Sequence, residues 1–135
     1  MSDRKTFKKG ERLKSRKAIN TLFQKGESFA RFPLRLVWMP MYERRSSQPV
    51  QFAVSVPKRR FRLATRRNRI KRQIREAYRL NKSHLYRFLN EDDPQIAFMI
   101  LFLAAEERPY NEVERAMRDI IHRFEKKWKA HRASS

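Results

Sequence analysis

Apolar residues recur at helical spacing near the start of the chain. Residues 15–26 predict a helix with Ser15 at its N-cap and Gly26 just beyond its C-terminal end. One face of this helix carries four apolar residues: Ala18, Ile19, Leu22 and Phe23. This spacing is typical of a short helix that packs one face onto a larger core.

The following segments change to the period of a β-strand. Apolar residues alternate with others over residues 28–39, where Pro33 favours an edge position because proline cannot donate a ladder hydrogen bond. Residues 50–56 alternate more regularly, and residues 61–65 could add a short third strand. Because one loop joins the first two segments, we expect them to pair with each other in the antiparallel direction.

The second half of the chain predicts two further helices and a strand. Apolar residues at i, i+4, i+7 and i+8 indicate a helix that begins near Thr65 and could end at Asn81. Residues 96–103 are continuously apolar, which is typical of a strand covered on both faces. Asn111 and Glu114 then form a capping-box-like start for a final amphipathic helix.

The predicted order is therefore helix, three strands, helix, strand, helix. This order indicates an α+β fold, an α/β sandwich in which three helices pack on one mostly antiparallel sheet of about four strands. A chain of 135 residues is long enough for one such domain with a modest core. We expect the domain to cover residues 12–125, between a basic N-terminal arm at 1–11 and a basic flexible tail at 126–135.

The charge of the chain limits the kinds of partner that it is expected to bind. Its 34 lysines and arginines against 14 acidic residues give a net charge of +20, which favours binding to nucleic acid or to an anionic membrane. Hydrophobic residues make up 40% of the chain, too many for a disordered basic tail. There is no cysteine, no apolar signal-peptide region and no apolar run of membrane-spanning length. We therefore expect a folded basic protein in the cytoplasm.

Residues 58–79 concentrate this charge. Eleven of the 22 residues are lysine or arginine, and only Glu76 is acidic. In the predicted helix, the face opposite the apolar one is polar and cationic: Asn68, Lys71, Arg72, Arg75 and Arg79. A merely solvated face normally mixes charges of both signs. A face with almost one sign of charge indicates a polyanionic partner, and nucleic acid is the first candidate.

Candidate catalytic residues are sparse. The chain has three histidines, which lie at no metal-ligand spacing: His84, His122 and His131. With two glycines in all, it has no glycine-rich phosphate loop. The carboxylates at 91–93 could hold Mg²⁺, although a turn before Pro94 explains them more simply. If the chain takes part in a reaction on nucleic acid, we expect the catalytic groups to come from its partner.

The basic helix also carries a motif. Arg67-Asn68-Arg69, followed by Lys71-Arg72 and Arg75-Glu76, resembles the RNR signature of the protein subunit of bacterial ribonuclease P. Further segments are similar to that family in the same order: AINTLFQKG at 18–26, FAVSVPKR at 52–59 and IAFMILFL at 96–103. The resemblance covers residues 12–125. Residues 60–66 depart from the family pattern, because a glycine is missing and one residue is added.

The resemblance implies a ribonucleoprotein that cuts the 5′ leader from precursor tRNA. In that family the RNA subunit holds the catalytic Mg²⁺ ions and performs the hydrolysis. The protein binds the RNA subunit and the leader, which raises the affinity for substrate and metal, and it contributes no catalytic residue. The resemblance also implies a left-handed βαβ crossover around the basic helix, in a fold shared with a ribosomal protein domain.

The resemblance further implies two RNA-binding surfaces. Contacts with the RNA subunit are expected from the basic helix: Arg67, Asn68, Arg69, Lys71, Arg72, Arg75 and Arg79. Asn68 could also help to place a metal ion. The leader is expected in a cleft between the first helix and the sheet: Ile19, Phe23, Val37, Trp38 and Lys58. The strand register decides whether Val37 or Trp38 faces that cleft.

Three alternatives stay open at this stage. The chain could be a general structured-RNA-binding or ribosome-associated protein without an enzymatic role, which the RNR spacing disfavours. It could be a metal-dependent nuclease in its own right, for which the carboxylates at 91–93 are poor candidates. It could attach to a membrane through its basic amphipathic helix, but the narrow apolar face is needed for packing.

Overall fold

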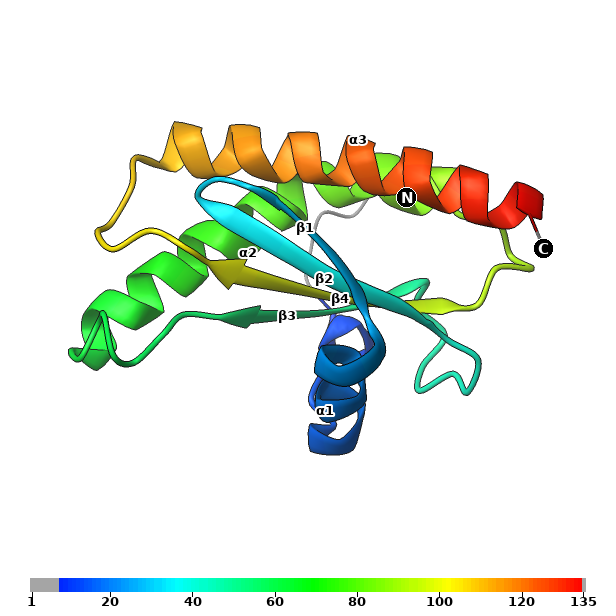
Figure 1. Ribbon diagram of the computed structural model, residues 1–135, viewed down its shortest axis with the longest axis horizontal. Coiled ribbons are helices and arrows are strands. Elements are labelled where there is room, and N and C mark those ends of the chain that lie inside the picture. The colour runs from blue at the N-terminus through cyan, green and yellow to red at the C-terminus, as the bar shows by residue number, and fades with distance from the viewer. Residues whose placement is uncertain (1–7, 135) are drawn as a thin grey trace.

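The computed structural model describes residues 8–134 and contains one mixed sheet with helices on both faces (Figure 1). The elements in chain order are a short 3₁₀ helix, η1 (Lys9–Glu11), then α1 (Arg16–Lys25), β1 (Glu27–Arg31), β2 (Leu34–Met41), β3 (Val50–Ser55), α2 (Ala64–Phe88), β4 (Gln95–Phe102) and α3 (Tyr110–Ser134). Figure 1 shows α3 along one face of the sheet and α1 projecting from the other. The predicted α+β class and order of elements are confirmed.

The sheet has the strand order β1-β2-β4-β3, which differs from the predicted pairing. β2 and β3 are not neighbours, because β4 lies between them, antiparallel to β2 and parallel to β3. The expected antiparallel pair of residues 28–39 and 50–56 is therefore wrong. After Gln95, β4 is apolar throughout because it has a neighbouring strand on each edge and helices on both faces of the sheet.

The single strand predicted over 28–39 is two strands. The chain reverses at Phe32 and Pro33, which a cis peptide bond joins, and β1 pairs back onto β2 from Arg31–Leu34 to Glu27–Trp38. Pro33 is therefore in the turn between β1 and β2, where its missing N–H costs no ladder bond. The third strand predicted at 61–65 is absent, and those residues lead into α2 instead.

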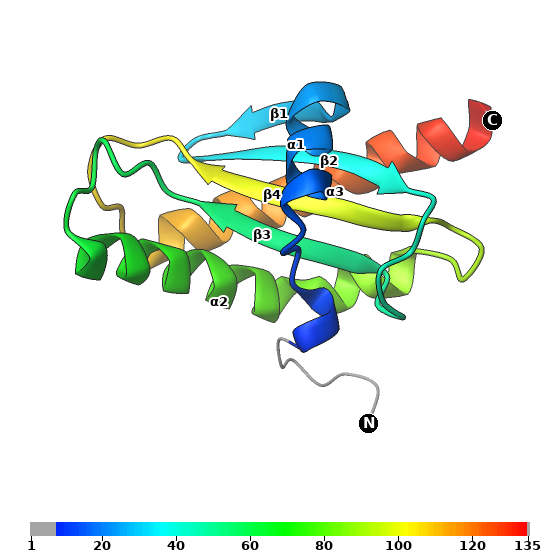
Figure 2. The same ribbon diagram turned by 90° about the horizontal axis from the view of Figure 1, so that it is seen from below.

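The connection from β3 through α2 to β4 is left-handed. β3 and β4 are parallel, and α2 packs on the same face of the sheet as α3. Seen from that face with both strands pointing upward, β4 lies to the left of β3, as Figures 1 and 2 together show. This confirms the crossover implied by the family resemblance, which is rare among βαβ units.

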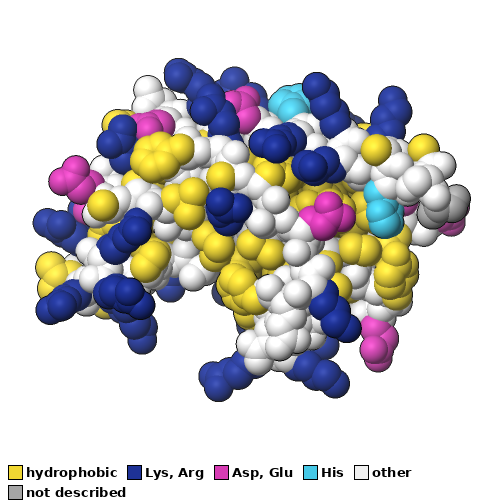
Figure 3. Space-filling view, viewed as in Figure 1, with side chains coloured by type: hydrophobic (Ala, Val, Ile, Leu, Met, Phe, Trp, Pro, Cys, Tyr) yellow, Lys and Arg dark blue, Asp and Glu magenta, His cyan; other side chains and the backbone are white. Residues whose placement is uncertain are grey.

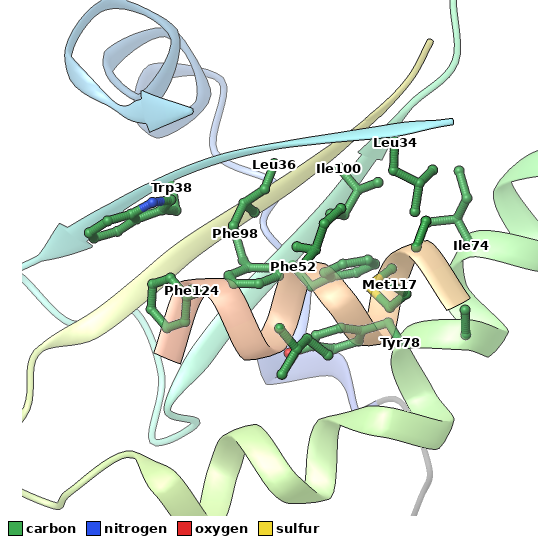
Figure 4. Close-up of a cluster of buried hydrophobic side chains, with 14 of the residues drawn as sticks. Leu34, Leu36, Trp38, Phe52, Ile74, Tyr78, Phe98, Ile100, Met117 and Phe124 are labelled. Carbon is green, nitrogen blue, oxygen red and sulfur yellow. The ribbon is translucent and has the colours of Figure 1, made fainter. Parts of the chain in front are cut away.

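The main core fills the space between the sheet and the two long helices (Figure 4). Alternate residues of the strands, including Leu36, Trp38 and Phe98, point to this face. Phe52 stacks on Tyr78 of α2 at 3.9 Å between ring centroids. Because α2 and α3 each place an apolar stripe here, the opposite side of α2 is left to solvent.

A smaller core lies under α1 on the other face of the sheet. Leu22 is fully buried there against Val37 and Met99. Ser15 Oγ accepts a hydrogen bond from the Ala18 N–H, which confirms the predicted N-cap. Gly26 ends the helix as predicted, but its φ of −72° is not left-handed. A Cβ on this glycine would lie 2.5 Å from the Leu22 carbonyl oxygen and 3.0 Å from Val37 Cγ1, so close packing explains the glycine.

Gly26→Ala is expected to lower the free energy of unfolding by about 1–3 kcal/mol, because the methyl group would clash with the Leu22 carbonyl of α1 and with Val37 of β2, so the end of α1 must shift to admit it. Urea denaturation would measure this. Gly10→Ala is the control, since the nearest atom to its Cβ is Ser46 Cβ at 3.2 Å, and a loss below about 1 kcal/mol is expected. Equal stability of Gly26→Ala and the original protein would contradict the steric explanation.

Both long helices extend beyond their predicted ends. α2 continues past Asn81 to Phe88, where the Leu89 N–H bonds to the Leu85 carbonyl. α3 begins at Tyr110, one residue before the predicted cap, and continues to Ser134. The flexible tail expected at 126–135 is therefore wrong up to Ser134, because Trp128 is buried and anchors this part of the helix to the core.

The N-terminal arm expected at 1–11 is also partly wrong. Residues 1–7 lie outside the described residues, but Lys9–Glu11 form a 3₁₀ helix that packs on the domain. The Glu11 carboxylate is fully buried and accepts hydrogen bonds from Lys82 Nζ at 2.8 and 2.9 Å. Tyr86 donates a further bond to it. Within residues 8–134, every helix is too short or too polar to span a membrane.

Candidate nucleic-acid interface

The first half of α2 presents its cationic face to solvent because its apolar face is fully used. Ile70, Ile74, Ala77 and Tyr78 are each 0% exposed in the core under the sheet. The helical period then directs the residues between them outward. The exposed residues on this part of α2 include Asn68, Arg69, Arg72 and Arg75. The predicted separation of an apolar and a cationic face is therefore confirmed.

Two of the RNR-motif arginines are partly held by the protein itself. Arg67 Nη1 donates to the carbonyl oxygens of Phe61 at 2.8 Å and Arg62 at 3.1 Å, so this arginine fixes the segment that enters α2. Arg69 Nη1 lies 3.2 Å from both carboxylate oxygens of Glu107, in the loop before α3. These bonds orient the start of the helix and leave the other guanidinium N–H groups of both residues for a ligand.

The cations further along the helix differ in how firmly they are held. Burial and the nearby Arg12 lower the pKa of Arg75. Because the pKa of an arginine is normally far above neutral, the guanidinium still stays charged near neutral pH. The hydrogen bond from Arg79 lowers the pKa of Glu76, and the two residues form an ion pair at 2.6 Å. Arg72 is exposed and makes no ion pair with any described residue. Arg72 and Arg75 are thus exposed cations of this face that make no ion pair with any described acidic residue.

A groove lies beside this face, on the side of the sheet that α1 covers only in part. It has a volume of about 730 Å³ and is lined by the ends of β3 and β4 and by the segment that follows β3: Ser55, Pro57, Lys58, Arg59, Arg60, Leu101, Phe102 and Leu103. Figure 3 shows this side of the molecule hollowed between α1 and a group of Lys and Arg side chains near the N-terminal end of α2. The groove therefore has an apolar floor and a cationic wall.

α1 packs on the same face of the sheet, next to Leu101, but its residues do not line this groove. Its flank with Lys17 and Thr21 borders a separate pocket near Tyr42. Phe23 is two residues beyond Thr21, about 200° around the helix, so it lies on the opposite flank of α1. Its ring is 53% exposed, which rejects the simpler interpretation of Phe23 as a core residue. Ile19 is half-buried on the same flank and packs on the smaller core.

The strand register settles which of Val37 and Trp38 faces α1. Val37 lies under α1 in the smaller core, whereas Trp38 is 1% exposed on the opposite face. The Trp38 ring packs edge-on against Phe124 and Trp128 of α3. The prediction that Trp38 belongs to the cleft is therefore wrong. Alternation along β2 left both residues possible, and only the position of α1 separates them.

The entrance to α2 departs from the family pattern but is well packed. Residues 58–60 form a turn, and the Phe61 ring is buried against Phe102 at 5.8 Å between centroids. Arg60 Nη1 donates to the Leu103 carbonyl at 2.5 Å and so closes the end of the groove. The chain after this anchored ring leads directly into α2, which begins at Ala64.

The sequence did not single out Arg60, Leu101 or Leu103 as lining residues, because they come from two segments that only the parallel pairing of β3 and β4 brings together. The carboxylates at 91–93 lie in a turn, where the Asp93 N–H bonds to the Asn90 carbonyl at 3.1 Å. Asp93 also pairs with Arg132 at 2.6 Å. These contacts fit the simpler interpretation of the cluster as a turn.

Comparisons with known proteins agree with this geometry. The family model of Ribonuclease P matches residues 7–127. The chain belongs to the ribonuclease P protein family. It is 44% identical over 119 residues to the ribonuclease P protein component from two strains of Porphyromonas gingivalis, covering 86% of this chain and 84% of each relative.

Solved ribonuclease P proteins share the fold. The Staphylococcus aureus protein superposes with a TM-score of 0.65 at 19% identity, over 83% of this chain and 93% of its own. The Thermotoga maritima protein also gives 0.65, at 20% identity, over 84% of this chain and 96% of its own. Membership of the family makes this chain an RNA-binding component of a tRNA-processing enzyme, so the alternative of a general RNA-binding protein outside any enzyme is set aside.

Proposed function

We propose that the cationic face of α2 binds the RNA subunit of ribonuclease P, while the groove beside it holds the 5′ leader of precursor tRNA. The observation that carries this proposal is the continuity of the two surfaces. The cationic wall of the groove, Lys58 to Arg60, leads within four residues into the start of α2 at Ala64. The RNA subunit can therefore lie on the helix while the leader of a precursor tRNA bound to it enters the neighbouring groove.

Each surface suits its proposed ligand. Guanidinium groups on a rigid helix can bind phosphate oxygens with paired hydrogen bonds. An unpaired base can stack on the exposed Phe23 ring of α1, and the Lys58 ammonium in the groove can bind its phosphate. The apolar floor at Leu101 excludes water from the stacked base without reading its sequence. This arrangement supports leader binding with little dependence on the leader sequence.

In this proposal the RNA subunit performs the hydrolysis. Mg²⁺ bound by the RNA would supply the activated water and stabilise the leaving oxygen. In this chain, the carboxylate nearest the RNR arginines is Glu107, which pairs with Arg66 and Arg69. The exposed Asn68 amide offers one neutral oxygen to a metal that phosphates hold. The chain then binds and orients RNA, and its described residues near the groove form no carboxylate cluster that would hold the ion alone.

The test is reconstitution at low Mg²⁺ with a bacterial ribonuclease P RNA and a precursor tRNA. We expect one cut at the mature 5′ end that needs both the protein and the RNA. Cleavage by the protein alone would contradict the proposal and favour an independent nuclease. Tight RNA binding without any gain in cleavage would contradict the leader-binding role.

Phe23→Ala is expected to weaken binding of precursor tRNA to the holoenzyme by about 1–3 kcal/mol, the range measured for loss of one base-stacking ring. The exposed ring contributes little to folding, so assembly with the RNA subunit should be unchanged. Titration with precursor tRNA and with leaderless tRNA separates the leader contribution.

Phe32→Ala is the matched control for Phe23→Ala. Phe32 is also 53% exposed, but it lies in the β1–β2 turn under Arg108 and beside the start of α3. We expect Phe32→Ala to leave leader binding unchanged. Equal losses from the two variants would contradict a specific stacking role for Phe23, and unfolding of Phe23→Ala would assign that ring to the core.

A further inference from the structure

Two histidines and a glutamate converge where α2 packs against α3. The sequence showed no metal-ligand spacing among the histidines, because His84 comes from α2 and His122 from α3. In the structure their rings lie 5.2 Å apart between centroids. Glu125 lies one turn beyond His122, on the same side of α3. We propose that His84, His122 and Glu125 bind one Zn²⁺ ion or a similar late first-row divalent metal.

The three donor atoms are already gathered. One ring nitrogen of each histidine and one carboxylate oxygen all lie within 4.8 Å of one another. His84 Nδ1 is 2.8 Å from Glu125 Oε2, and His122 Nδ1 is 4.0 Å from Glu125 Oε1. Tetrahedral zinc with bonds of about 2.0–2.2 Å needs its donors about 3.3 Å apart. Small rotations of two exposed imidazoles reach this spacing without any movement of the backbone.

The burial of Glu125 is an independent reason to expect a cation. Its side chain is 9% exposed, whereas the side chains of His84 and His122 are 57% and 56% exposed. Among the described residues, the carboxylate is hydrogen-bonded to His84 Nδ1, and it has no lysine or arginine within ion-pair distance. A buried carboxylate is costly unless a cation or several hydrogen bonds compensate it. A metal ion held between the two imidazoles would supply that charge.

The donor set also selects the class of metal. Two imidazole nitrogens with one carboxylate oxygen suit zinc and its neighbours, whereas Mg²⁺ and Ca²⁺ prefer sites made of oxygen ligands only. Three protein donors leave one coordination position for water or another small ligand. The cluster lies beyond the exposed arginines of the proposed RNA face, because His84 is nine residues past Arg75, about 14 Å further along the helix axis.

Bound metal would join the C-terminal half of α2 to α3. These helices are not adjacent in sequence, since β4 separates them. A ligand that binds only the folded arrangement stabilises it in proportion to the ligand concentration relative to Kd. With Zn²⁺ in excess we expect the melting temperature to rise by at least about 3 °C, a shift that the same concentration of Mg²⁺ should not reproduce.

The experiment uses the full chain without an affinity tag, titrated with Zn²⁺ by calorimetry in a buffer that does not chelate metals. We expect one equivalent of Zn²⁺ to bind. His84→Ala and His122→Ala should each weaken binding at least about tenfold, because loss of even an outer-shell partner of a metal site costs about 10- to 100-fold in affinity. Both side chains are more than half exposed, so both variants should fold. Substitution with Co²⁺ would report four-coordinate geometry through its visible absorption.

His131→Ala is the matched control. His131 also lies on α3, but its ring stacks on Trp128 and is not part of the cluster. We expect its Zn²⁺ affinity and melting shift to match those of the original protein. The proposal is overturned if no stoichiometric Zn²⁺ binds, or if the His84→Ala/His122→Ala double variant binds Zn²⁺ as tightly as the original chain.

Discussion

Glu11→Ala is expected to lower the free energy of unfolding by about 3–5 kcal/mol, the largest effect that we expect from a single substitution in this chain. The substitution removes the carboxylate and leaves the Lys82 ammonium, 4% exposed, without its anion in the core. Breaking one side of a buried ion pair costs far more than the pair contributes, because the remaining charge is neither solvated nor compensated.

The network around Glu11 explains why the loss should spread. Tyr86 donates to Glu11, and the Tyr86 and Tyr78 hydroxyls lie 3.0 Å apart. Burial raises the pKa of both tyrosines, so both remain protonated and able to donate. The Glu11–Lys82 ion pair also holds the segment that leads to α1. Two residues beyond Glu11, the Leu13 N–H donates a hydrogen bond to the Phe52 carbonyl of β3. Loss of the carboxylate should therefore loosen both the N-terminal segment and the middle of α2.

Urea denaturation of the variant and of two controls measures this effect. Glu43→Ala removes an exposed carboxylate and should change stability by less than about 0.5 kcal/mol. Glu11→Leu combined with Lys82→Met removes both charges and should recover most of the loss, because an apolar pair leaves no uncompensated charge. A loss below about 1 kcal/mol in Glu11→Ala would show that the pair is not an essential anchor.

Arg72→Ala combined with Arg75→Ala is expected to weaken assembly with the RNA subunit by about 10- to 100-fold at moderate salt. Each substitution removes one candidate phosphate contact, and each such contact releases counterions when it forms. The plot of log K against log salt concentration should therefore become shallower by about 2. Folding should be unaffected, because both side chains are exposed and alanine favours the helix.

Lys126→Ala combined with Lys129→Ala is the matched control for this double variant. It lowers the net charge by the same amount, but on exposed positions of α3. Binding curves at several salt concentrations should show a smaller loss and a smaller change of slope than for the α2 variant. If the two double variants weaken assembly equally, net charge rather than the face of α2 governs RNA binding, and our assignment of that face fails.

The elements that the sequence predicted correctly are those with strong local signals. The Ser15 cap and the glycine after Lys25 bounded α1, because both act within one turn of the helix. The i, i+4, i+7 spacing from Ile70 to Tyr78 placed the cationic face of α2, and the unbroken apolar run identified β4 as the covered strand. The RNR spacing in that same helix carried the family assignment, which the match over residues 7–127 confirms.

The features that the sequence missed depend on partners distant in the chain. Alternation over 28–39 predicted a strand but not the reversal at Pro33, because both halves keep the same period. Alternation also could not show which of Val37 and Trp38 faces α1, because that depends on α1 and α3 packing on opposite faces of the sheet. Burial of Trp128 extends α3 through a region whose composition predicted a tail.

The sequence by itself determined the class of fold, the cationic helix and the family, because periodicity, capping and motif spacing are local properties of the chain. Only the tertiary structure decided the strand order, the groove at the ends of β3 and β4, the burial of Glu11 beside Lys82, and the meeting of His84 with His122 and Glu125. Each of these joins residues from separate elements. Their contacts follow from how apolar faces pack together, which no single segment specifies.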